Sequence, residues 1–424
     1  MATIWVKPKS PRKRRLIFVN RYYHPDCSAT AQLLEDLTSA ASVTDRQVSV
    51  VTGRYRYDQT DLRLAPRQTL NGIDIHRIWT PGFNRSNTYA RVIEYLCFYA
   101  MATVAVWRLA RAGDVVVATT DPPMLSVALQ PVVSLRNAQL INWLQDLYPE
   151  IAERLGWSKH SPGRFAFRML ARARNHSLRV AAANIAPGQL MRDHLLKNHV
   201  PHESLHVIHN WSDDEGIRPV SQPQNKMRRH WQFRPEHFIV AYSGNLGRAH
   251  EIKTLLVAIR YFERATDPAA RNIRFLFVGG GFHYDCLRSE TNCHSRLVTF
   301  QPYQPRAALT LSLGVADVHL TILRRELEGL VVPSKFYGIA AAGRAIIHIG
   351  DLNGEIARVL ADGSCGFAVA EGDGNGLVQA IRKLAKNRER TTAMGLRARQ
   401  LLEENYTRRS ALAAWQRIID DVSN

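Results

Sequence analysis

Short apolar runs recur along the first half of the chain, and each is followed by a polar or glycine-containing loop. They predict strands at residues 15–19, 47–53, 114–120, 139–143, 180–185 and 205–208. Residues 29–42, between the first two runs, carry leucines at the spacing of an amphipathic helix. Strands that alternate with helices in this way indicate a parallel sheet covered by helices on both faces.

The same alternation restarts in the second half of the chain. It predicts strands at residues 238–242, 273–278, 297–300, 316–320 and 345–349. A polar stretch with two prolines, residues 210–223, lies between the halves and is typical of a linker. The pattern therefore predicts an α/β protein made of two doubly wound domains in tandem.

The length of the chain supports this division. A single core rarely grows beyond about 250–300 residues, and this chain has 424. We expect a basic arm at residues 1–15, a first domain at 16–215 and a second domain at 216–400. Residues 401–424 remain for a C-terminal helix, whose amphipathic part lies near 410–421.

The charge of the chain is strongly unbalanced. Lys and Arg number 56 against 37 Asp and Glu, which gives a formal net charge of +19. Such an excess indicates an anionic partner, namely nucleic acid, membrane headgroups or phosphorylated ligands. It is concentrated in the N-terminal arm and in residues 154–179, where Arg164, Arg168 and Arg172 are four apart and would share one helical face. A solvated surface is the alternative interpretation.

Five scattered cysteines without a Cys-x-x-Cys pair argue against a disulfide framework or a zinc site and fit a reducing cytoplasm. The apolar stretch at residues 16–19 is too short for a signal peptide. The longest apolar run, residues 95–107, is shorter than the roughly 20 residues that span a bilayer. It predicts either a buried helix or a helix that dips into the membrane interface. In the second case its aromatic side chains would make the contact: Tyr95, Phe98, Tyr99 and Trp107.

A glycine-rich turn follows the predicted strand that ends at Tyr242. It reads Ser243-Gly244-Asn245-Leu246-Gly247-Arg248, and a predicted helix comes after it. The two glycines lack a Cβ and let the backbone approach a ligand, while loop amides and the arginine fork suit phosphate oxygens. Taken alone, this turn is either a phosphate site or an ordinary turn.

A second candidate cation lies at the start of a helix of small residues, 338–343. Lys335 occupies a position where the helix dipole already favours anions, so a lysine there is unusual. It is either a surface lysine or a cation kept for a phosphate ligand.

Five segments of the chain, in this order, resemble glycosyltransferase family 4, and most closely its exopolysaccharide and O-antigen branch. They are Ala-Thr-Ala-Gln (29–32), Gln-Asp-Leu-Tyr-Pro-Glu (145–150), Tyr-Ser-Gly-Asn-Leu-Gly-Arg-Ala-His (242–250), Phe-Val-Gly-Gly-Gly (277–281) and Val-Pro-Ser-Lys-Phe-Tyr (332–337). The resemblance implies a GT-B fold, in which two Rossmann-like domains face a central cleft. It also implies that the sugar nucleotide binds the second domain, that the acceptor binds the first, and that the final helix crosses back.

The same resemblance implies a retaining glycosyltransferase of hexosyltransferase type that uses neither a metal nor a cofactor, with a UDP-sugar as the commonest donor. The expected acceptor is a saccharide on a polyprenyl diphosphate. The expected location is the cytoplasmic, inner face of the plasma membrane, where a basic peripheral protein meets anionic headgroups. Two alternatives remain: a sugar-nucleotide epimerase of GT-B fold, and a non-enzymatic protein that binds nucleic acid or another anionic surface. No aromatic-basic motif supports nucleic acid.

The resemblance also assigns residues on the donor side. The diphosphate loop falls on Gly244, Asn245, Gly247 and Arg248, and Lys335 matches a second cation on the leaving group. Two fixed cations would stabilise the negative charge that develops on the β-phosphate. The other matching donor positions are Gly279, Gly281, Tyr303 and Ser334, and the matching acceptor-side positions are Ser28, Ala29 and Thr30.

One feature departs from the family. The family carries two glutamates separated by seven residues, and here Glu326 and Glu328 are both possible first members. The second position falls on Ser334 or Gly338, so ribose recognition must differ. Glu355 is a candidate for that role, and an ordinary acid at a helix N-terminus is the alternative.

The acceptor hydroxyl must lose a proton during transfer. Asp146 follows the predicted strand 139–143 and would lie at its carboxyl end, where ligands of doubly wound sheets bind. We prefer it as the acid/base or acceptor-positioning residue, with Glu150 second. The alternatives are that Asp146 caps a turn, and that the leaving phosphate takes the proton itself.

Overall fold

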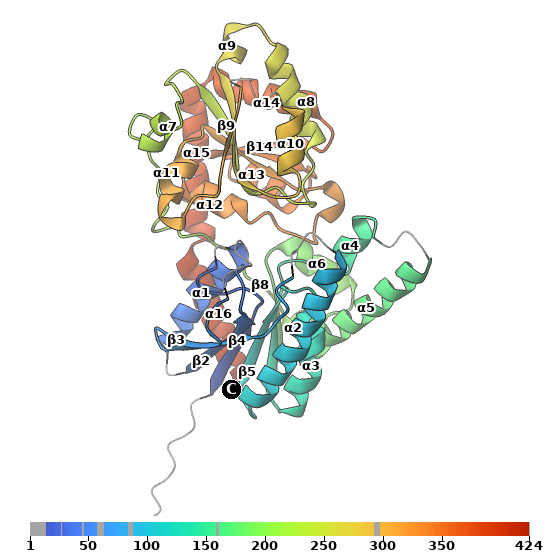
Figure 1. Cartoon of the computed structure of the whole chain (residues 1–424). Coiled ribbons are helices and arrows are strands. Elements are labelled where there is room, and N and C mark those ends of the chain that lie inside the picture. Colours follow the sequence, from blue (N-terminus) through green and yellow to red (C-terminus); the bar gives the residue numbers. More distant parts are fainter. Residues whose placement is uncertain are drawn as a thin grey trace, which may run out of the picture.

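The computed structural model describes residues 14–423, except 27, 45, 57–62, 84–87, 158–160 and 292–296. Figure 1 shows two α/β units, one above the other, with the N-terminal half of the chain forming the lower unit. This confirms the predicted fold class.

The first unit is built on an eight-stranded sheet in the order β3-β4-β2-β1-β5-β6-β7-β8. Its strands are β1 (Arg15–Val19), β2 (Gln47–Gly53), β3 (Arg67–Leu70), β4 (Ile73–Ile78), β5 (Val115–Thr119), β6 (Gln139–Trp143), β7 (Ala183–Ala186) and β8 (Leu205–Val207). All described neighbours are parallel except β3 and β4, which form a hairpin. The order reverses between β1 and β5, which places a ligand crevice at the carboxyl ends of these strands.

Helices cover both faces of this sheet. They are α1 (Ala29–Ser42), α2 (Thr88–Leu109), α3 (Leu125–Leu135), α4 (Glu150–Arg154), α5 (Ser161–Val180) and α6 (Gln189–Lys197). Side chains of β1 alternate between the two cores: Leu16 and Phe18 lie on the side of α1, while Ile17 and Val19 lie on the side of α2 and α3. This two-sided burial is why the strands appear in the sequence as continuous apolar runs.

The second unit has a six-stranded parallel sheet in the order β11-β10-β9-β12-β13-β14. Its strands are β9 (Phe238–Asn245), β10 (Ile273–Gly280), β11 (Val298–Gln301), β12 (Val318–Ile322), β13 (Ala345–Gly350) and β14 (Gly366–Ala370). Counted from β9, this is the order 3-2-1-4-5-6 of a Rossmann sheet, with its switch point between β9 and β12.

The helices of this unit are α7 (Lys226–His230), α8 (Lys253–Arg264), α9 (Pro268–Arg271), α10 (Tyr284–Glu290), α11 (Leu309–Gly314), α12 (Lys335–Ala341), α13 (Glu355–Asp362), α14 (Gly374–Lys386) and α15 (Arg388–Asn405). Short 3₁₀ turns are η1 (His202–Ser204), η2 (Arg306–Ala308) and η3 (Arg325–Leu327). The last helix, α16 (Arg408–Ser423), packs on the first unit, where Trp415 lies 4.9 Å from Trp143 between ring centroids. The segment that returns therefore begins at Arg408 rather than at residue 401.

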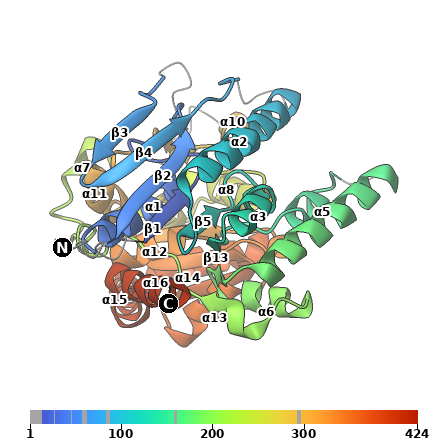
Figure 2. The ribbon, with the colours of Figure 1, turned by 90° about the horizontal axis from the view of Figure 1, so that it is seen from below.

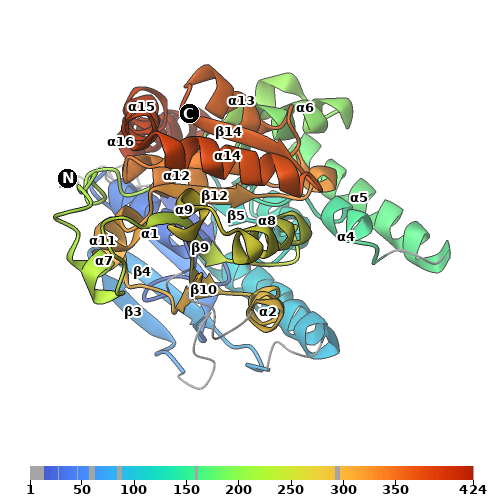
Figure 3. The same cartoon turned by 90° about the horizontal axis from the view of Figure 1, so that it is seen from above.

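The views from below and above show how the helices project from this body (Figures 2 and 3). Helix α5 extends outward, and α2 projects from the same side of the first unit.

The hairpin β3–β4 and the strand β14 are absent from the sequence prediction. The hairpin had a local signal, since Asn71 and Gly72 adopt φ angles of 50° and 79° and form the two-residue turn that such a pair favours. Strand β14 is short and only half-buried over most of its length, so it lacks the apolar run of the other strands.

Candidate functional site

The carboxyl ends of the two sheets face one another, and loops from both units touch there. The loop after β6 pairs with the loop after β12: the backbone of Asp146 bridges Val331, and the amide of Leu147 donates to the carbonyl oxygen of Leu330 over 3.0 Å. Both switch points thus open onto one interdomain region, as expected for a ligand site between two Rossmann-like units.

The predicted glycines of the second unit meet at this edge. A Cβ on Gly279 would lie 2.4 Å from the carbonyl oxygen of Gly244, and one on Gly281 would lie 2.2 Å from Asn245 Oδ1. All three glycines have φ between 124° and 133°, a conformation that other residues rarely adopt. The loops after β9 and β10 therefore pack together only because these positions are glycine.

Lys335 lies against the loop after β9. The sequence predicts that this lysine and the glycine turn in that loop bind the same donor. A Cβ on Gly244 would come within 2.8 Å of Lys335 Cε. The ammonium lies 3.4 Å from His250 Nε2 and 5.2 Å from the centroid of the Tyr242 ring. Burial lowers the pKa of Lys335 to about 8. Among the residues that the structure describes, no carboxylate forms an ion pair with this lysine.

His250 also belongs to this site, although the sequence indicates no role for it beyond its place at the end of the segment 242–250. Its Nδ1 lies 3.0 Å from the carbonyl oxygen of Gly247. A carbonyl only accepts, so Nδ1 carries the proton and Nε2 is left to accept from the ammonium of Lys335. Burial, and then the charge of Lys335, lower the pKa of His250 to about 3, which keeps the ring neutral.

Arg248 lies at the exposed mouth of the same loop. Its guanidinium carbon is 3.9 Å from the centroid of the Phe282 ring, and that ring is 57% exposed. Burial, and then the charges of Arg324 and Arg248, lower the pKa of His283. The mouth of the site is therefore positively charged, which suits an anion.

Tyr303 closes the other side of the glycine turn. A Cβ on Gly279 would lie 3.2 Å from its ring, and one on Gly280 would lie 3.3 Å from it. The structure thus brings Tyr303, a predicted donor-side residue, next to the predicted glycines. Ser334 precedes Lys335 as the N-cap of α12, and its side chain makes no capping hydrogen bond.

The three candidate glutamates occupy different places. Glu326 is exposed in η3, 3.5 Å from Arg324. Glu328 is half-buried, and its Oε1 accepts a hydrogen bond of 2.9 Å from the amide of Glu355 at the start of α13. Burial, and then the nearby charges of Glu355 and Asp351, raise the pKa of Glu328. Of the two possible first glutamates, Glu328 is the one held inside the interdomain region.

Glu355, the candidate for ribose recognition, is the first residue of α13, and its carboxylate is bound by backbone amides of the first unit. Its two carboxylate oxygens accept hydrogen bonds from the amides of Gln189 and Leu190, at 3.0 and 2.9 Å. These amides belong to the first turn of α6, whose dipole also favours a carboxylate there. Glu355 is therefore a contact between the two units, and both of its oxygens are already engaged.

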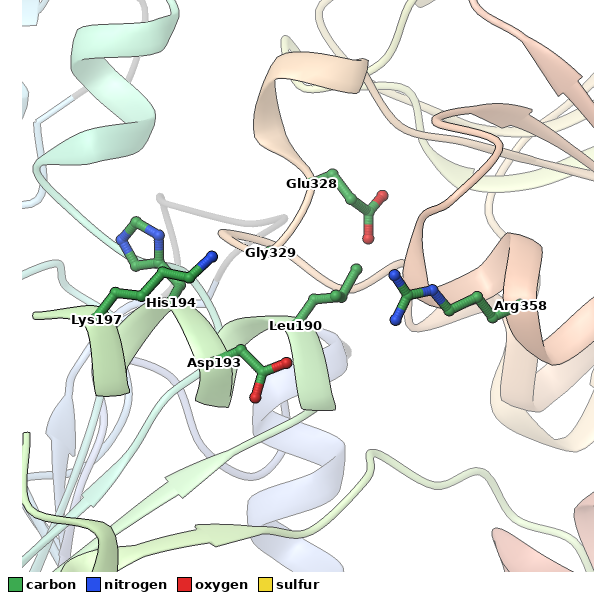
Figure 4. A pocket seen from close by; sticks show the side chains of 7 residues that line it. All are labelled: Leu190, Asp193, His194, Lys197, Glu328, Gly329 and Arg358. Atoms are coloured by element: carbon green, nitrogen blue, oxygen red, sulfur yellow. The ribbon is translucent and has the colours of Figure 1, made fainter.

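A cavity of about 360 Å³ lies beside this contact (Figure 4). Glu328 and Arg358 project into it from the second unit, opposite His194 and Lys197 of α6. Its other lining residues are Leu190, Asp193 and Gly329. The lining is mostly charged and comes from both units.

Asp146 lies at the carboxyl end of β6, where the sequence placed it. Its amide donates to the hydroxyl of Thr120 over 3.3 Å. Burial, and then the charge of Asp121, raise the pKa of Asp146 to about 6. A carboxyl group with this pKa is half-ionised near pH 6 and can exchange a proton with a substrate at neutral pH.

Several residues that the sequence did not assign to the acceptor site lie near Asp146. Burial, followed by Asp146, Tyr95 and Asp121, raises the pKa of Tyr148, so these side chains lie in one cluster. Arg21 joins the cluster from the end of β1: its guanidinium carbon is 4.9 Å from the centroid of the Tyr95 ring, and it pairs with Glu94 at 2.6 Å. Both Tyr95 and Glu94 come from α2, whose contribution local spacing did not reveal.

The remaining acceptor-side candidates are Ser28, Ala29, Thr30 and Glu150. Ser28 is the N-cap of α1, which begins with Ala29 and Thr30, and its buried hydroxyl has no hydrogen-bond partner among the described residues. Glu150 is bound by Arg174 and lies 3.8 Å from His194. Burial would raise the pKa of Glu150, but His194 and Arg174 together keep it below its ordinary value. Glu150 is thus engaged in an ion pair and is less available than Asp146.

No group of three or more His, Cys, Asp and Glu side chains that could hold a metal ion occurs within the described part of the chain.

Replacing Gly281 with alanine is expected to disrupt the donor-side loop. The new Cβ would collide with Asn245 Oδ1 at 2.2 Å and with the amide nitrogen of Leu246 at 2.6 Å, in addition to the strain of φ = 124°. Gly372→Ala is the matched control, because its φ is 90° but nothing lies within 4 Å of its Cβ. Both variants should lose about 1–3 kcal/mol of unfolding free energy from backbone strain. Only Gly281→Ala should also lose binding of a nucleoside diphosphate in calorimetry, and equal binding by both variants would contradict the role of the loop.

Comparison with known proteins finds a family match within the second unit. Residues 237–387 match the family described as glycosyl transferases group 1. The probable glycosyltransferase WbjE of Pseudomonas aeruginosa is 28% identical over 342 residues, which cover 77% of this chain and 79% of that protein.

Solved structures show the same architecture over nearly the whole chain. Sucrose-phosphate synthase from Thermosynechococcus elongatus has a TM-score of 0.73 at 14% identity and covers 97% of this chain and 99% of its own. WaaG, a glycosyltransferase involved in lipopolysaccharide biosynthesis, has a TM-score of 0.72 at 13% identity, with 95% and 99% covered. HepE of Anabaena in complex with UDP-glucose has a TM-score of 0.68 at 14% identity, with 96% and 99% covered. The chain has the GT-B fold. Its second unit is similar to the family of glycosyl transferases group 1.

Proposed function

We propose that this protein transfers a sugar from a nucleoside diphosphate sugar to a saccharide acceptor, with retention of configuration, and that the donor is a UDP-sugar. The observation that carries the proposal is the half-buried ammonium of Lys335, which lies against Gly244. A cation in such a place without a carboxylate partner is costly unless an anion binds there. The diphosphate of a sugar nucleotide is an anion of the right kind, and the HepE structure contains UDP-glucose in the same fold.

The chemistry assigned to the donor side is stabilisation of the leaving group. When the bond between the sugar and the β-phosphate breaks, negative charge builds up on the phosphate oxygens. Lys335, held by neutral His250, and Arg248, held on Phe282, supply two fixed positive charges to meet it. Fixed charges of this kind lower the barrier because they need no reorganisation during the reaction.

The chemistry assigned to the acceptor side is proton removal from the attacking hydroxyl. Asp146 is our candidate for this step, because its raised pKa near 6 lets it act as a base at neutral pH. The leaving phosphate is the other possible proton acceptor in a retaining transfer. The acceptor we propose is a saccharide on a polyprenyl diphosphate at the inner face of the plasma membrane. The likeness in fold to WaaG, which takes part in lipopolysaccharide biosynthesis, agrees with such a role.

A panel of UDP-, GDP- and dTDP-sugars tests the donor assignment. A UDP-sugar at a concentration one hundred times its dissociation constant contributes about 2.7 kcal/mol to stability. We expect this to raise the melting temperature by about 3 °C or more. The variant Arg248→Ala should show a smaller shift at the same concentration. If no sugar nucleotide changes the melting temperature of the unaltered protein, the proposed donor site is wrong. Product analysis then separates transfer from epimerisation, because only transfer consumes an acceptor.

A further inference from the structure

Helix α2 carries a continuous apolar stripe on its outer side. Tyr89, Val92, Ile93, Leu96, Val104 and Trp107 are all exposed, by 41% to 81%. Apart from the adjacent Val92 and Ile93, successive members are three or eight residues apart, which places all six within one face of the helix. The stripe is about 27 Å long, since each helical residue rises about 1.5 Å.

The opposite side of the same helix belongs to the core of the first unit. Phe98, Ala102 and Val106 are fully buried there against the sheet and α3. By length and composition α2 could cross a membrane, since residues 89–109 have a mean hydropathy of 1.4. Crossing would remove these three side chains from their core, so the helix is better suited to lie flat with only its outer stripe in contact with lipid. An apolar stripe of this size left in water is unfavourable and indicates a partner.

Helix α5 presents a second amphipathic surface nearby. Its first half stands away from the body on the side of the molecule where α2 projects (Figures 1 and 2). Phe165, Arg168, Met169 and Leu170 are exposed in this half, and Arg172 is exposed just after it. The two helices are connected through α3, which contacts both of them.

The charge of these three helices identifies the partner. The sequences of α2, α3 and α5 contain one acidic residue, Glu94, and that residue is buried in its ion pair with Arg21. Basic residues border the apolar stripe: Arg108 follows Trp107, and the guanidinium of Arg136 lies 5.1 Å from the centroid of the Trp107 ring. Exposed apolar side chains edged by arginine and tryptophan, without exposed acids, fit the headgroup region of an anionic bilayer.

We propose that the outer stripe of α2 and the first half of α5 together form a docking surface for an anionic lipid bilayer. The surface lies close to the acceptor side of the site, because Glu94 and Tyr95 of α2 contact Arg21 of the acceptor-side cluster while the neighbouring Ile93 and Leu96 face outward. One helix diameter, about 10–12 Å, therefore separates the membrane from the acceptor groups. The docking surface itself does not depend on the proposed function. Its purpose does, because only a transferase with a lipid-linked acceptor needs that acceptor held at the membrane beside its acceptor site.

The sequence predicts that an interfacial helix would use the aromatic side chains of Tyr95, Phe98, Tyr99 and Trp107. In the structure Phe98 is buried and Tyr95 lies beside Arg21, so of these aromatic residues Trp107 faces outward with the stripe.

Flotation of the full chain with vesicles of phosphatidylglycerol and phosphatidylethanolamine tests the surface. We expect binding that is lost with pure phosphatidylcholine and that weakens as salt is added. Leu96→Ser should lower the vesicle affinity about tenfold, because a leucine leaves the lipid. Leu396→Ser is the matched control, since Leu396 is a helix leucine of the second unit with 53% exposure against 59% for Leu96. Arg168→Glu should lower the vesicle affinity to a similar extent. Arg390→Glu makes the same change in net charge and should leave the vesicle affinity unchanged.

Three results would overturn the proposal. The first is equal vesicle binding by Leu96→Ser and Leu396→Ser. The second is a dimer of the unaltered protein in sedimentation that Leu96→Ser abolishes, because the stripe would then bind a second copy of the chain. The third is resistance to extraction at alkaline pH, which would indicate a spanning helix. Binding of UDP should be unchanged in Leu96→Ser and weakened in Arg248→Ala, so failure of the docking surface and failure of the donor site are separately visible.

Discussion

Replacing Lys335 with methionine is expected to abolish sugar transfer and, at neutral pH, to make the ligand-free protein more stable. The loss of rate should be about 10²–10³-fold or more, as found when one fixed donor to a developing anion is removed. The loss should appear mainly in kcat, because the contact strengthens as charge builds on the leaving phosphate. Steady-state kinetics with a UDP-sugar measure it.

The gain in stability follows from the lowered pKa of Lys335. The folded protein releases this proton at a pH of about 8, whereas the unfolded chain keeps it to about 10.5. Between these values the unfolded state binds more protons, so stability rises with pH, and below pH 8 the full cost of the buried charge is present. Lys335→Met removes that cost, which we place at about 1–3 kcal/mol. Urea unfolding should show the gain at pH 7 and its disappearance above pH 10.5.

Lys253→Met is the control for both effects, because Lys253 is an exposed lysine at the start of α8. It should leave turnover and stability nearly unchanged. Near-normal turnover of Lys335→Met would remove the lysine from the leaving-group role. A loss of stability in that variant would show that the lysine has an anionic partner within the protein.

Replacing Asp146 with asparagine is expected to lower kcat by about 10²–10⁴-fold, the usual contribution of a general base. In the unaltered protein, kcat/KM should rise with pH through about 6, because the ionised carboxylate is the active form. The variant should lose this dependence. A pH–rate profile from pH 5 to 8 distinguishes this outcome from simple misfolding.

The stability of the Asp146 variant provides a second readout. The folded protein holds the proton to a pH of about 6, while the unfolded chain releases it near 3.8. The folded state therefore binds more protons in this interval, and stability falls as pH rises through it. Above pH 6, Asp146→Asn should be more stable than the unaltered protein by about 1 kcal/mol or more.

Glu150→Gln is a useful comparison, because Glu150 was the second acid/base candidate. It should lose stability through its ion pair with Arg174 and retain most of its turnover. If Asp146→Asn turns over normally, the leaving phosphate takes the proton and the chain supplies no base at this position.

The sequence was a good guide wherever the signal is local. Most strands were predicted within a few residues, because a strand buried on both faces must be an unbroken apolar run. The glycine turn at 244–247 and the turn at 279–281 were also found, since positive φ and close backbone contact demand glycine at particular positions.

The sequence was a poorer guide for α2, for Glu355 and for His250. The run 95–107 is apolar on all sides, so its spacing could not show which side faces the core, and the helix proved to extend over Thr88–Leu109. Glu355 had the sequence context of an acid at a helix N-terminus, yet its carboxylate is bound by the start of α6, about 165 residues earlier in the chain. His250 carried no signal of its own, because its partner Lys335 is 85 residues away.

The sequence by itself determined the two doubly wound units, the phosphate-type loop and the excess of positive charge. Each of these features follows from the local spacing of residues, from backbone conformations that require glycine, or from composition. Only the tertiary structure decided which side chains meet: Lys335 with His250, Asp146 with the Tyr148 and Tyr95 cluster, and Glu355 with α6. It also decided which side of α2 is left in water. The physical reason is that these pairings join distant segments, and their geometry is set by how two sheets and their helices pack rather than by any short stretch of chain.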